Sequence, residues 1–123
     1  MECTTESEKI NLKRQLSRGK GDIPQFFEKI HQRIKSLNEN ISQKVNTQNV
    51  VYKVNKNFAE IKIQTINIRI VLIAVEYKDI FGVKVEEVEA TYKWGRKIKM
   101  YIKNENELNI VLPLIKRSYD ISL

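Results

Sequence analysis

Apolar side chains recur at three- and four-residue spacing after Asp22, a pattern that predicts an amphipathic helix. Asp22 is a good N-cap, Gln25 takes the capping-box position three residues later, and Pro24 is tolerated in a first turn. Asn38 and Asn40 suit the end of this helix. The stripe expected to face a sheet comprises Ile23, Phe26, Phe27, Ile30, Ile34 and Leu37.

Three strands joined by two short turns are expected between Val50 and Glu76, where apolar and polar residues alternate with period two. The third strand loses its alternation over 71–75, so we expect it to be central and covered on both faces for part of its length. The expected strands are 50–54, 58–64 and 68–76.

The region that follows predicts one loop and two more strands. Residues 77–85 are expected to form a loop that pivots at Gly82, and 88–92 a further strand before a turn at Trp94–Gly95. Residues 97–102 alternate cleanly and predict another strand. Its expected inward side chains are Ile98, Met100 and Ile102, and its outward ones are Lys97, Lys99 and Tyr101.

A final helix is expected from Asn104, an N-cap with Glu107 at the capping-box position. Pro113 inside it removes one backbone hydrogen bond, so a kink or a break is expected there. The expected apolar face comprises Leu108, Val111, Leu112, Ile115 and Tyr119.

The order helix, strands, helix predicts an α+β fold: a two-layer sandwich in which an antiparallel meander sheet carries the N- and C-terminal helices on one face. A chain of 123 residues supplies one core. We expect a polar, basic tail or linker over 1–21 and a single domain over 22–123, with a short helix over 10–16 as the alternative for the tail.

The chain has 22 Lys and Arg against 15 Asp and Glu, a balance that favours a polyanionic partner or an anionic surface. The alternative is that this positive charge has no functional partner. Cys3 is the only cysteine, which excludes an internal disulfide and fits a reducing compartment. The first residues have no apolar leader, and no apolar run approaches the ~20 residues of a membrane span. We therefore expect a cytoplasmic protein with no membrane partner.

Catalytic patterns are weak in this chain. Glu60-Ile61-Lys62 matches half of a PD-(D/E)XK nuclease core, but the only upstream aspartate is Asp22, already a helix cap. Alternation of charge on a half-exposed strand is the competing interpretation. His31 has no second ligand residue beside it and is expected at the surface or its boundary. We expect no enzyme activity, no metal and no cofactor.

Glu86, Glu87 and Glu89 form the one acidic cluster, which fits a solvated loop or edge strand better than a cation site. Cations with interleaved aromatics are more prominent, because no acid occurs between Lys93 and Lys103. On a half-exposed sheet such residues give phosphate contacts and stacking platforms. The candidate nucleic-acid-binding residues are Lys53, Lys62, Arg69, Lys93, Trp94, Arg96, Lys97, Lys99 and Tyr101.

Two alternatives remain open for the same face. It is either the ordinary polar side of an antiparallel sheet, with Glu60 among its cations, or a contact surface. Val51, Val71 and Ile73 are expected there too, which favours a homodimer or another protein partner.

Several segments of the chain, taken together, resemble the domain of unknown function family numbered 5655, often labelled "predicted transport protein". They are FFEKIHQRIKSL, Tyr52–Ile61, Arg69–Leu72, Trp94–Gly95 and Leu114–Tyr119. The resemblance covers roughly 23–119 and implies a domain that occurs alone or at the C-terminus of longer proteins, some with nuclease-like or restriction-associated partners. The chain departs from that family at Lys93, where a His is usual, and at 79–82, where the family segment is longer.

The expected function is therefore a non-catalytic accessory module of a nuclease- or restriction-associated context that binds nucleic acid weakly through a basic sheet face. The alternative is a protein-interaction or homodimerisation domain that uses the apolar part of the same face.

Overall fold

A computed structural model describes residues 1–73, 76–77, 82–88 and 97–123 of the chain. The described helices are α1 (Glu6–Arg18), α2 (Ile23–Lys35) and α3 (Glu105–Ile121). The described strands are β1 (Ser42–Val45), β2 (Val50–Lys53), β3 (Asn57–Ile63), β4 (Ile68–Ile73), β5 (Lys84–Val88) and β6 (Lys97–Ile102).

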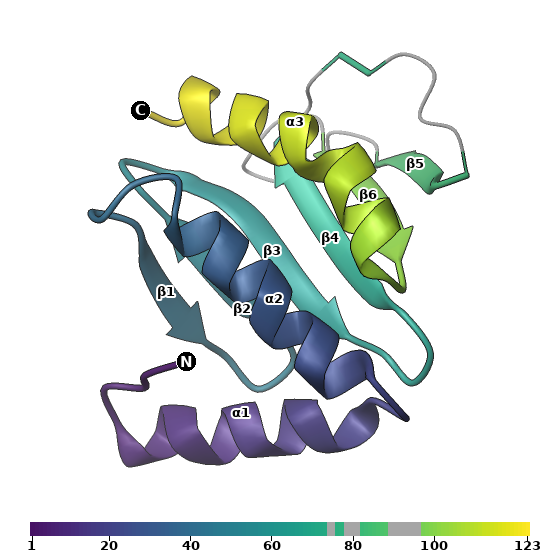
Figure 1. The fold of residues 1–123 in the computed structure, drawn as a ribbon. Coiled ribbons are helices and arrows are strands. Elements are labelled where there is room, and N and C mark those ends of the chain that lie inside the picture. The colour runs from purple at the N-terminus through teal and green to yellow at the C-terminus, as the bar shows by residue number, and fades with distance from the viewer. Residues whose placement is uncertain (74–75, 78–81, 89–96) are drawn as a thin grey trace.

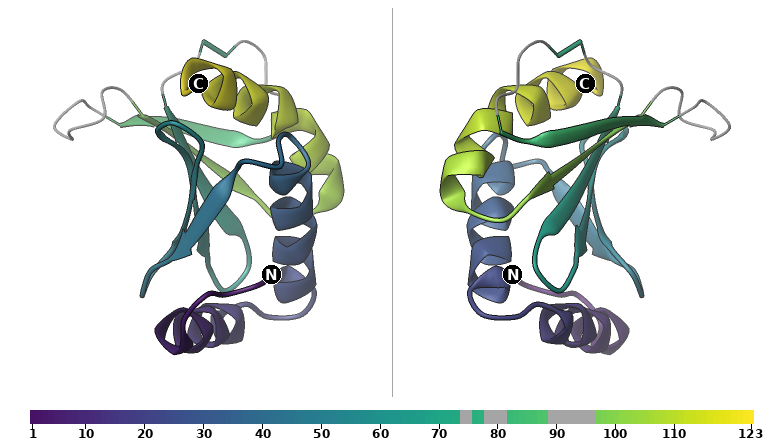
Figure 2. Two further views of the ribbon diagram at one scale, coloured as in Figure 1. Left: turned by 90° about the vertical axis from the view of Figure 1, so that its left-hand side faces the viewer. Right: turned by 90° about the vertical axis from the view of Figure 1, so that its right-hand side faces the viewer.

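The six strands form one antiparallel sheet in the order β1-β2-β3-β4-β6-β5. Helices α2 and α3 pack side by side on one face of it (Figure 1). Figure 2 shows that no described helix covers the opposite face, while α1 crosses one end of the sheet. The expected α+β sandwich, with N- and C-terminal helices on one face, is confirmed. The meander is regular through β4, and β6 then lies between β4 and β5.

The core lies between the sheet and helices α2 and α3, and every second side chain of the strands points into it. Ile61, Ile70 and Met100 lie next to one another across β3, β4 and β6, and all three are fully buried. The apolar stripes of α2 and α3 cover these strands, as expected for a sheet that buries one face. The inward positions predicted for 97–102 are confirmed, because Ile98, Met100 and Ile102 are all buried.

A register shift between Tyr52 and Lys53 marks a bulge where β2 meets β3. Phe58 is the unpaired residue, and both Phe58 and Ala59 are buried although they are neighbours in a strand. The ring of Phe58 meets that of Tyr119 edge-on, with centroids 5.6 Å apart. The bulge therefore seals the core against the end of α3.

Helix α3 runs unbroken through Pro113, so of the two expected outcomes, a kink or a break, the break does not occur. The ribbon bends near its middle, and Pro113 stands at the centre of the 17 residues (Figures 1 and 2). Asn104 caps the helix as predicted, because its side chain accepts a hydrogen bond from the backbone of Glu107 at 2.9 Å. The Glu107 carboxylate in turn accepts from the backbone of Lys103.

The segment expected to be a tail contains α1, which includes the short helix over 10–16 that was the alternative prediction. Thr5 caps this helix, and Leu12 and Gln15 are buried on its inner side. The sequence obscured it because the helix is mostly polar and its buried side is narrow. At α2 the correction is smaller: Asp22 occupies the N-cap, but its side chain makes no capping hydrogen bond.

Two edge strands were not predicted where they occur. β1 lies in a segment with no strand prediction, and β5 begins inside the expected loop 77–85. Both are short and mostly polar, and each is paired along one side only. Pairing with the neighbouring strand, and not the local sequence, therefore determines that these residues form strands. Most of the strand predicted over 88–92 lies outside the described residues.

None of the described helices is both long and apolar enough to cross a membrane.

Candidate nucleic-acid interface

The face of the sheet turned away from α2 and α3, here called the open face, is set by the register of the strands. One row across it joins Val51, Glu60, Val71, Lys99 and Glu86. Because side chains alternate along each strand, the next row two residues away faces the same side. That row joins Lys62, Arg69, Tyr101 and Lys84.

The register brings together most of the residues predicted to bind nucleic acid. Lys62, Arg69, Lys99 and Tyr101 share the open face, and Lys53 joins them at the end of β2. The backbone of Lys97 pairs with Ile73 and Val88, which places that residue in the same alternation. The remaining predicted residues, Lys93, Trp94 and Arg96, lie outside the described part of the chain, as does the side chain of Lys97.

Lys62 and Arg69 stand directly opposite each other on β3 and β4 and are called the basic pair here. Within the described residues neither makes an ion pair with a carboxylate, and the Nε atom of Arg69 is buried without a hydrogen-bond partner. Like charges directly opposite in an antiparallel pair repel each other. Among the described residues, the basic pair is therefore a positive centre of the open face that has no ion-pair partner.

The acids of the open face are engaged by their neighbours. The Lys84 ammonium lies 3.0 Å from Glu86 and lowers the pKa of that carboxyl, while Glu86 raises the pKa of Lys84. Lys84 also lies over the ring of Tyr101, 5.6 Å from its centroid. Glu60 accepts a hydrogen bond from the Asn49 side chain. Glu86 is therefore paired with Lys84, whereas Glu60 keeps its charge; among the described residues the cations of the open face, Lys44, Lys53, Lys62, Arg69, Lys84 and Lys99, outnumber these two acids.

Apolar residues lie on the open face where they were predicted, but they expose little surface. Val71 is 6% exposed, and Val51 and Ile73 are half-buried. The large apolar side chains that are exposed in the described structure lie elsewhere: Ile10, Ile66, Ile110, Ile121 and Leu123.

A polar groove of about 570 Å³ opens on the same face, beside the β1–β2 hairpin. We call it the hairpin groove. Four amide side chains, Glu60 and the two cations Lys44 and Lys53 are among the residues that line it. Its full lining is Ser42, Gln43, Lys44, Asn46, Asn49, Val51, Lys53, Asn57 and Glu60.

Sequence reasoning missed Lys44 and Lys84 because the strands that carry them, β1 and β5, were not predicted. It missed the groove because asparagines in a turn are ordinarily read as turn formers. The only signal was the density of amides over 43–57, which a turn explains equally well.

The nuclease-like arrangement of Glu60 and Lys62 does not acquire its aspartate. Glu60 lies on the open face, whereas Asp22 begins α2, which covers the other face of the sheet. Among the described residues, no three His, Cys, Asp or Glu side chains gather in one place.

His31 is buried, although it was expected at the surface or its boundary. It is 8% exposed, and its Nδ1 atom lies 2.8 Å from the hydroxyl of the fully buried Tyr52. Burial lowers the pKa of His31 and raises the pKa of Tyr52 well above its usual value. A neutral imidazole and a neutral phenol thus satisfy each other inside the core, a structural role.

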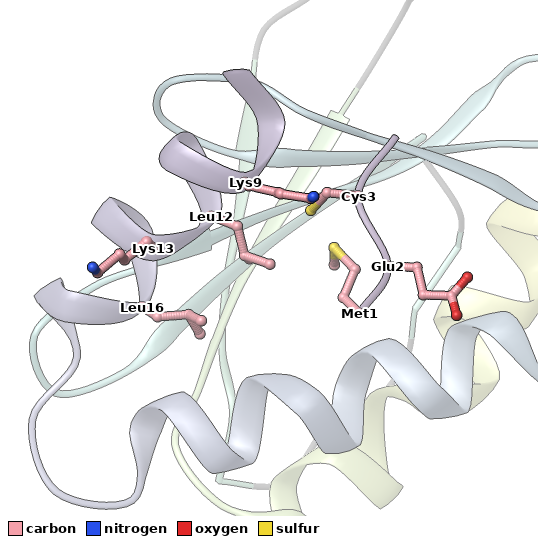
Figure 3. A pocket seen from close by; sticks show the side chains of 7 residues that line it. All are labelled: Met1, Glu2, Cys3, Lys9, Leu12, Lys13 and Leu16. Carbon is pink, nitrogen blue, oxygen red and sulfur yellow. The ribbon is translucent and has the colours of Figure 1, made fainter. Parts of the chain in front are cut away.

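A second pocket lies between the N-terminal residues and α1 (Figure 3). Leu12 and Leu16 point into it, opposite Met1 and Cys3. Burial, followed by the nearby Glu8, raises the pKa of the Cys3 thiol, which disfavours the reactive thiolate. This pocket therefore offers no activated nucleophile.

No protein-family model, no curated protein and no solved structure matches the chain.

Proposed function

We propose that the protein is a non-catalytic accessory module that binds nucleic acid through its open face. The observation that carries the proposal is the basic pair, two adjacent cations without a carboxylate partner among the described residues. A phosphate group bound between Lys62 and Arg69 would remove their mutual repulsion. It would also accept hydrogen bonds from the Arg69 guanidinium, because a guanidinium matches phosphate in a two-pronged geometry.

The other charges of the open face extend this site. Lys99 lies one row away from the basic pair, and Lys44 and Lys53 lie toward the β1 edge. Tyr101 is opposite Arg69 and presents a ring beside the cations. Cations spread over several strands, with an aromatic ring between them, suit a chain of phosphates with bases better than a single small anion.

The alternative, homodimerisation through the same face, has less support. A dimer contact needs roughly 800 Å² of surface on each partner, with an apolar centre. Here Val71 is already buried, and none of the large apolar side chains exposed in the described structure lies on the open face. Repulsion between two copies of the basic pair would oppose the contact further.

The proposal includes a cytoplasmic location and a partner protein that performs chemistry on the nucleic acid, such as a nuclease. The module would supply affinity, and its partner the catalysis. The open face supports the affinity half of this division, and nucleic-acid binding tests that half.

The decisive experiment is the Lys62→Glu variant. It places a carboxylate opposite Arg69, so the free energy of unfolding should rise by about 0.2–1 kcal/mol as a cross-strand ion pair forms. Affinity for nucleic acid should fall, and the slope of log K against log[salt] should decrease, because at least one phosphate contact is lost. Urea unfolding and fluorescence anisotropy measure the two quantities.

Lys13→Glu on α1 is the matched control, because Lys13 is exposed and makes no ion pair within the described structure. It changes the net charge equally but should leave affinity nearly unchanged. If both variants lost the same affinity for nucleic acid, the loss would be due to net charge and not to the basic pair. Absence of any binding by the unmodified protein at low salt would overturn the proposal.

A further inference from the structure

The hairpin groove adds a concave feature to an otherwise open sheet face. Residues of the β1–β2 hairpin line it together with Asn57 and Glu60 of β3, and Val51 and Glu60 are directly opposite each other in the sheet. Glu60 and Lys62 are two residues apart on β3, so the groove adjoins the basic pair on the same face.

The polar side chains of this groove form an ordered chain. The Asn46 amide donates to the Oδ1 atom of Asn49 at 3.0 Å, and the Asn49 amide donates to Glu60. An asparagine amide has two N–H donors and a carboxylate has two oxygens, so Asn49 and Glu60 retain a donor and an acceptor next to each other. A neighbouring donor and acceptor are what the edge of a nucleobase pairs with.

The groove is held in shape from behind by α1. The Nε2 atom of buried Gln15 donates to the carbonyl of Asn46 at 2.6 Å and to that of Asn49 at 3.2 Å. The Arg18 guanidinium donates to the carbonyls of Thr47 and Gln48. The hairpin that carries the groove amides is therefore fixed before any ligand arrives, which lowers the cost of ordering them.

We propose that the hairpin groove receives one unpaired base of single-stranded nucleic acid, whose adjoining phosphates lie on the basic pair. This inference rests on the proposed function and specifies its substrate. Base edges within a duplex are reachable only by a convex element that enters a groove of the nucleic acid, whereas a concave site needs a base that protrudes. A volume of about 570 Å³ accommodates a base together with water.

Asn49 and Glu60 read the base, while Lys44 and Lys53 attract the strand to either side of it. The groove therefore contributes base preference, and the basic pair contributes affinity that is independent of sequence. These two contributions should respond separately to substitution.

The test compares oligoadenylate, oligocytidylate and oligothymidylate of equal length with a duplex of the same length, measured by fluorescence anisotropy. We expect single strands to bind more tightly than the duplex, with about a tenfold spread among the three bases. Asn49→Ala should shrink that spread without changing the salt dependence. Lys62→Glu should weaken all three alike and keep their ratios.

Glu60→Gln provides a second variant in case Asn49→Ala disturbs the hairpin. The substitution preserves shape and still accepts from Asn49, but it adds a donor, so the preferred base should change. Equal binding of duplex and single strands, or unchanged base ratios in both groove variants, would overturn the inference while leaving the proposed function intact. Failure of every oligonucleotide to bind would instead overturn the proposed function.

Discussion

The hydrogen bond between His31 and Tyr52 shows how one buried contact fixes the charge state of a side chain. Burial is the main cause of the lowered pKa of His31; the nearby Glu28 opposes it, whereas the N-terminal amine of Met1 and Lys35 add to it. The imidazole is therefore neutral in the folded protein at neutral pH. Its protonation would place a charge in the core beside a phenol that barely ionises.

This arrangement predicts a loss of stability in mild acid. The unfolded chain binds a proton at His31 more readily, since the pKa there is the ordinary value of about 6.5. The stability that the neutral His31 contributes is fully present above the unfolded pKa. It is lost as the pH falls through that value toward the lower pKa of the folded protein. Urea unfolding between about pH 7.5 and pH 5 should record the decrease.

His31→Gln is the control, because glutamine can still bond to the Tyr52 hydroxyl but does not titrate. Its stability should change less over the same interval. The pKa of Glu8 is also lowered, first by the Thr4 hydroxyl, but its contribution is lost only below its ordinary value of 4.5. Parallel pH profiles for the wild type and His31→Gln would contradict the prediction.

Among the elements, α1 has the most consequences, because its inner side holds the β1–β2 hairpin. We expect Gln15→Ala to lower the free energy of unfolding by about 1–3 kcal/mol, since two hydrogen bonds to the hairpin carbonyls are lost. Hydrogen exchange should also accelerate at the Asn46 amide, which donates to the Asn49 carbonyl. Arg14→Ala, on the exposed side of the same helix, should change neither quantity appreciably.

The connection between α1 and α2 depends on two glycines for different reasons. A Cβ at Gly19 would lie 2.7 Å from the Cγ2 atom of Ile23, a buried core residue, whereas Gly21 has open space but a φ of +58°. We expect Gly21→Ala to cost about 1 kcal/mol through its left-handed backbone, and Gly19→Ala to cost more because Ile23 must move. Thermal unfolding of the two variants measures which substitution destabilises the protein more. A smaller loss of stability in Gly19→Ala than in Gly21→Ala would contradict the prediction.

The predictability of each element followed the strength of its pattern. β3, β4, β6, α2 and α3 were predicted because their buried positions repeat at a clear period, and the same alternation placed Lys62, Arg69 and Lys99 on one face. Helix α1 was predicted only as an alternative and too short, and β1 and β5 were not predicted. Each depends on tertiary contacts: Gln15 with the hairpin carbonyls, and the edge strands with a single neighbour. The groove could not be predicted without them.

On the scale of the whole molecule, the two faces of the sheet differ in character. One is covered by α2 and α3, and the described residues of the other include cations without an ion-pair partner and little exposed apolar surface. We therefore expect the protein to sediment as a monomer at micromolar concentration in moderate salt. A concentration-dependent dimer would favour the alternative function, and retention of that dimer in Lys62→Glu would place its contact away from the basic pair.

The strand order also matters during synthesis on the ribosome. β4 pairs with β3 as soon as both exist, but its other neighbour, β6, begins only at Lys97. Until then β4, the most apolar strand, is the edge of a half-built sheet and presents unpaired backbone groups that invite aggregation between nascent chains. Arrival of β6 covers that edge and moves the border to β5, where Lys84 and Glu86 make a short, charged strand that resists further pairing.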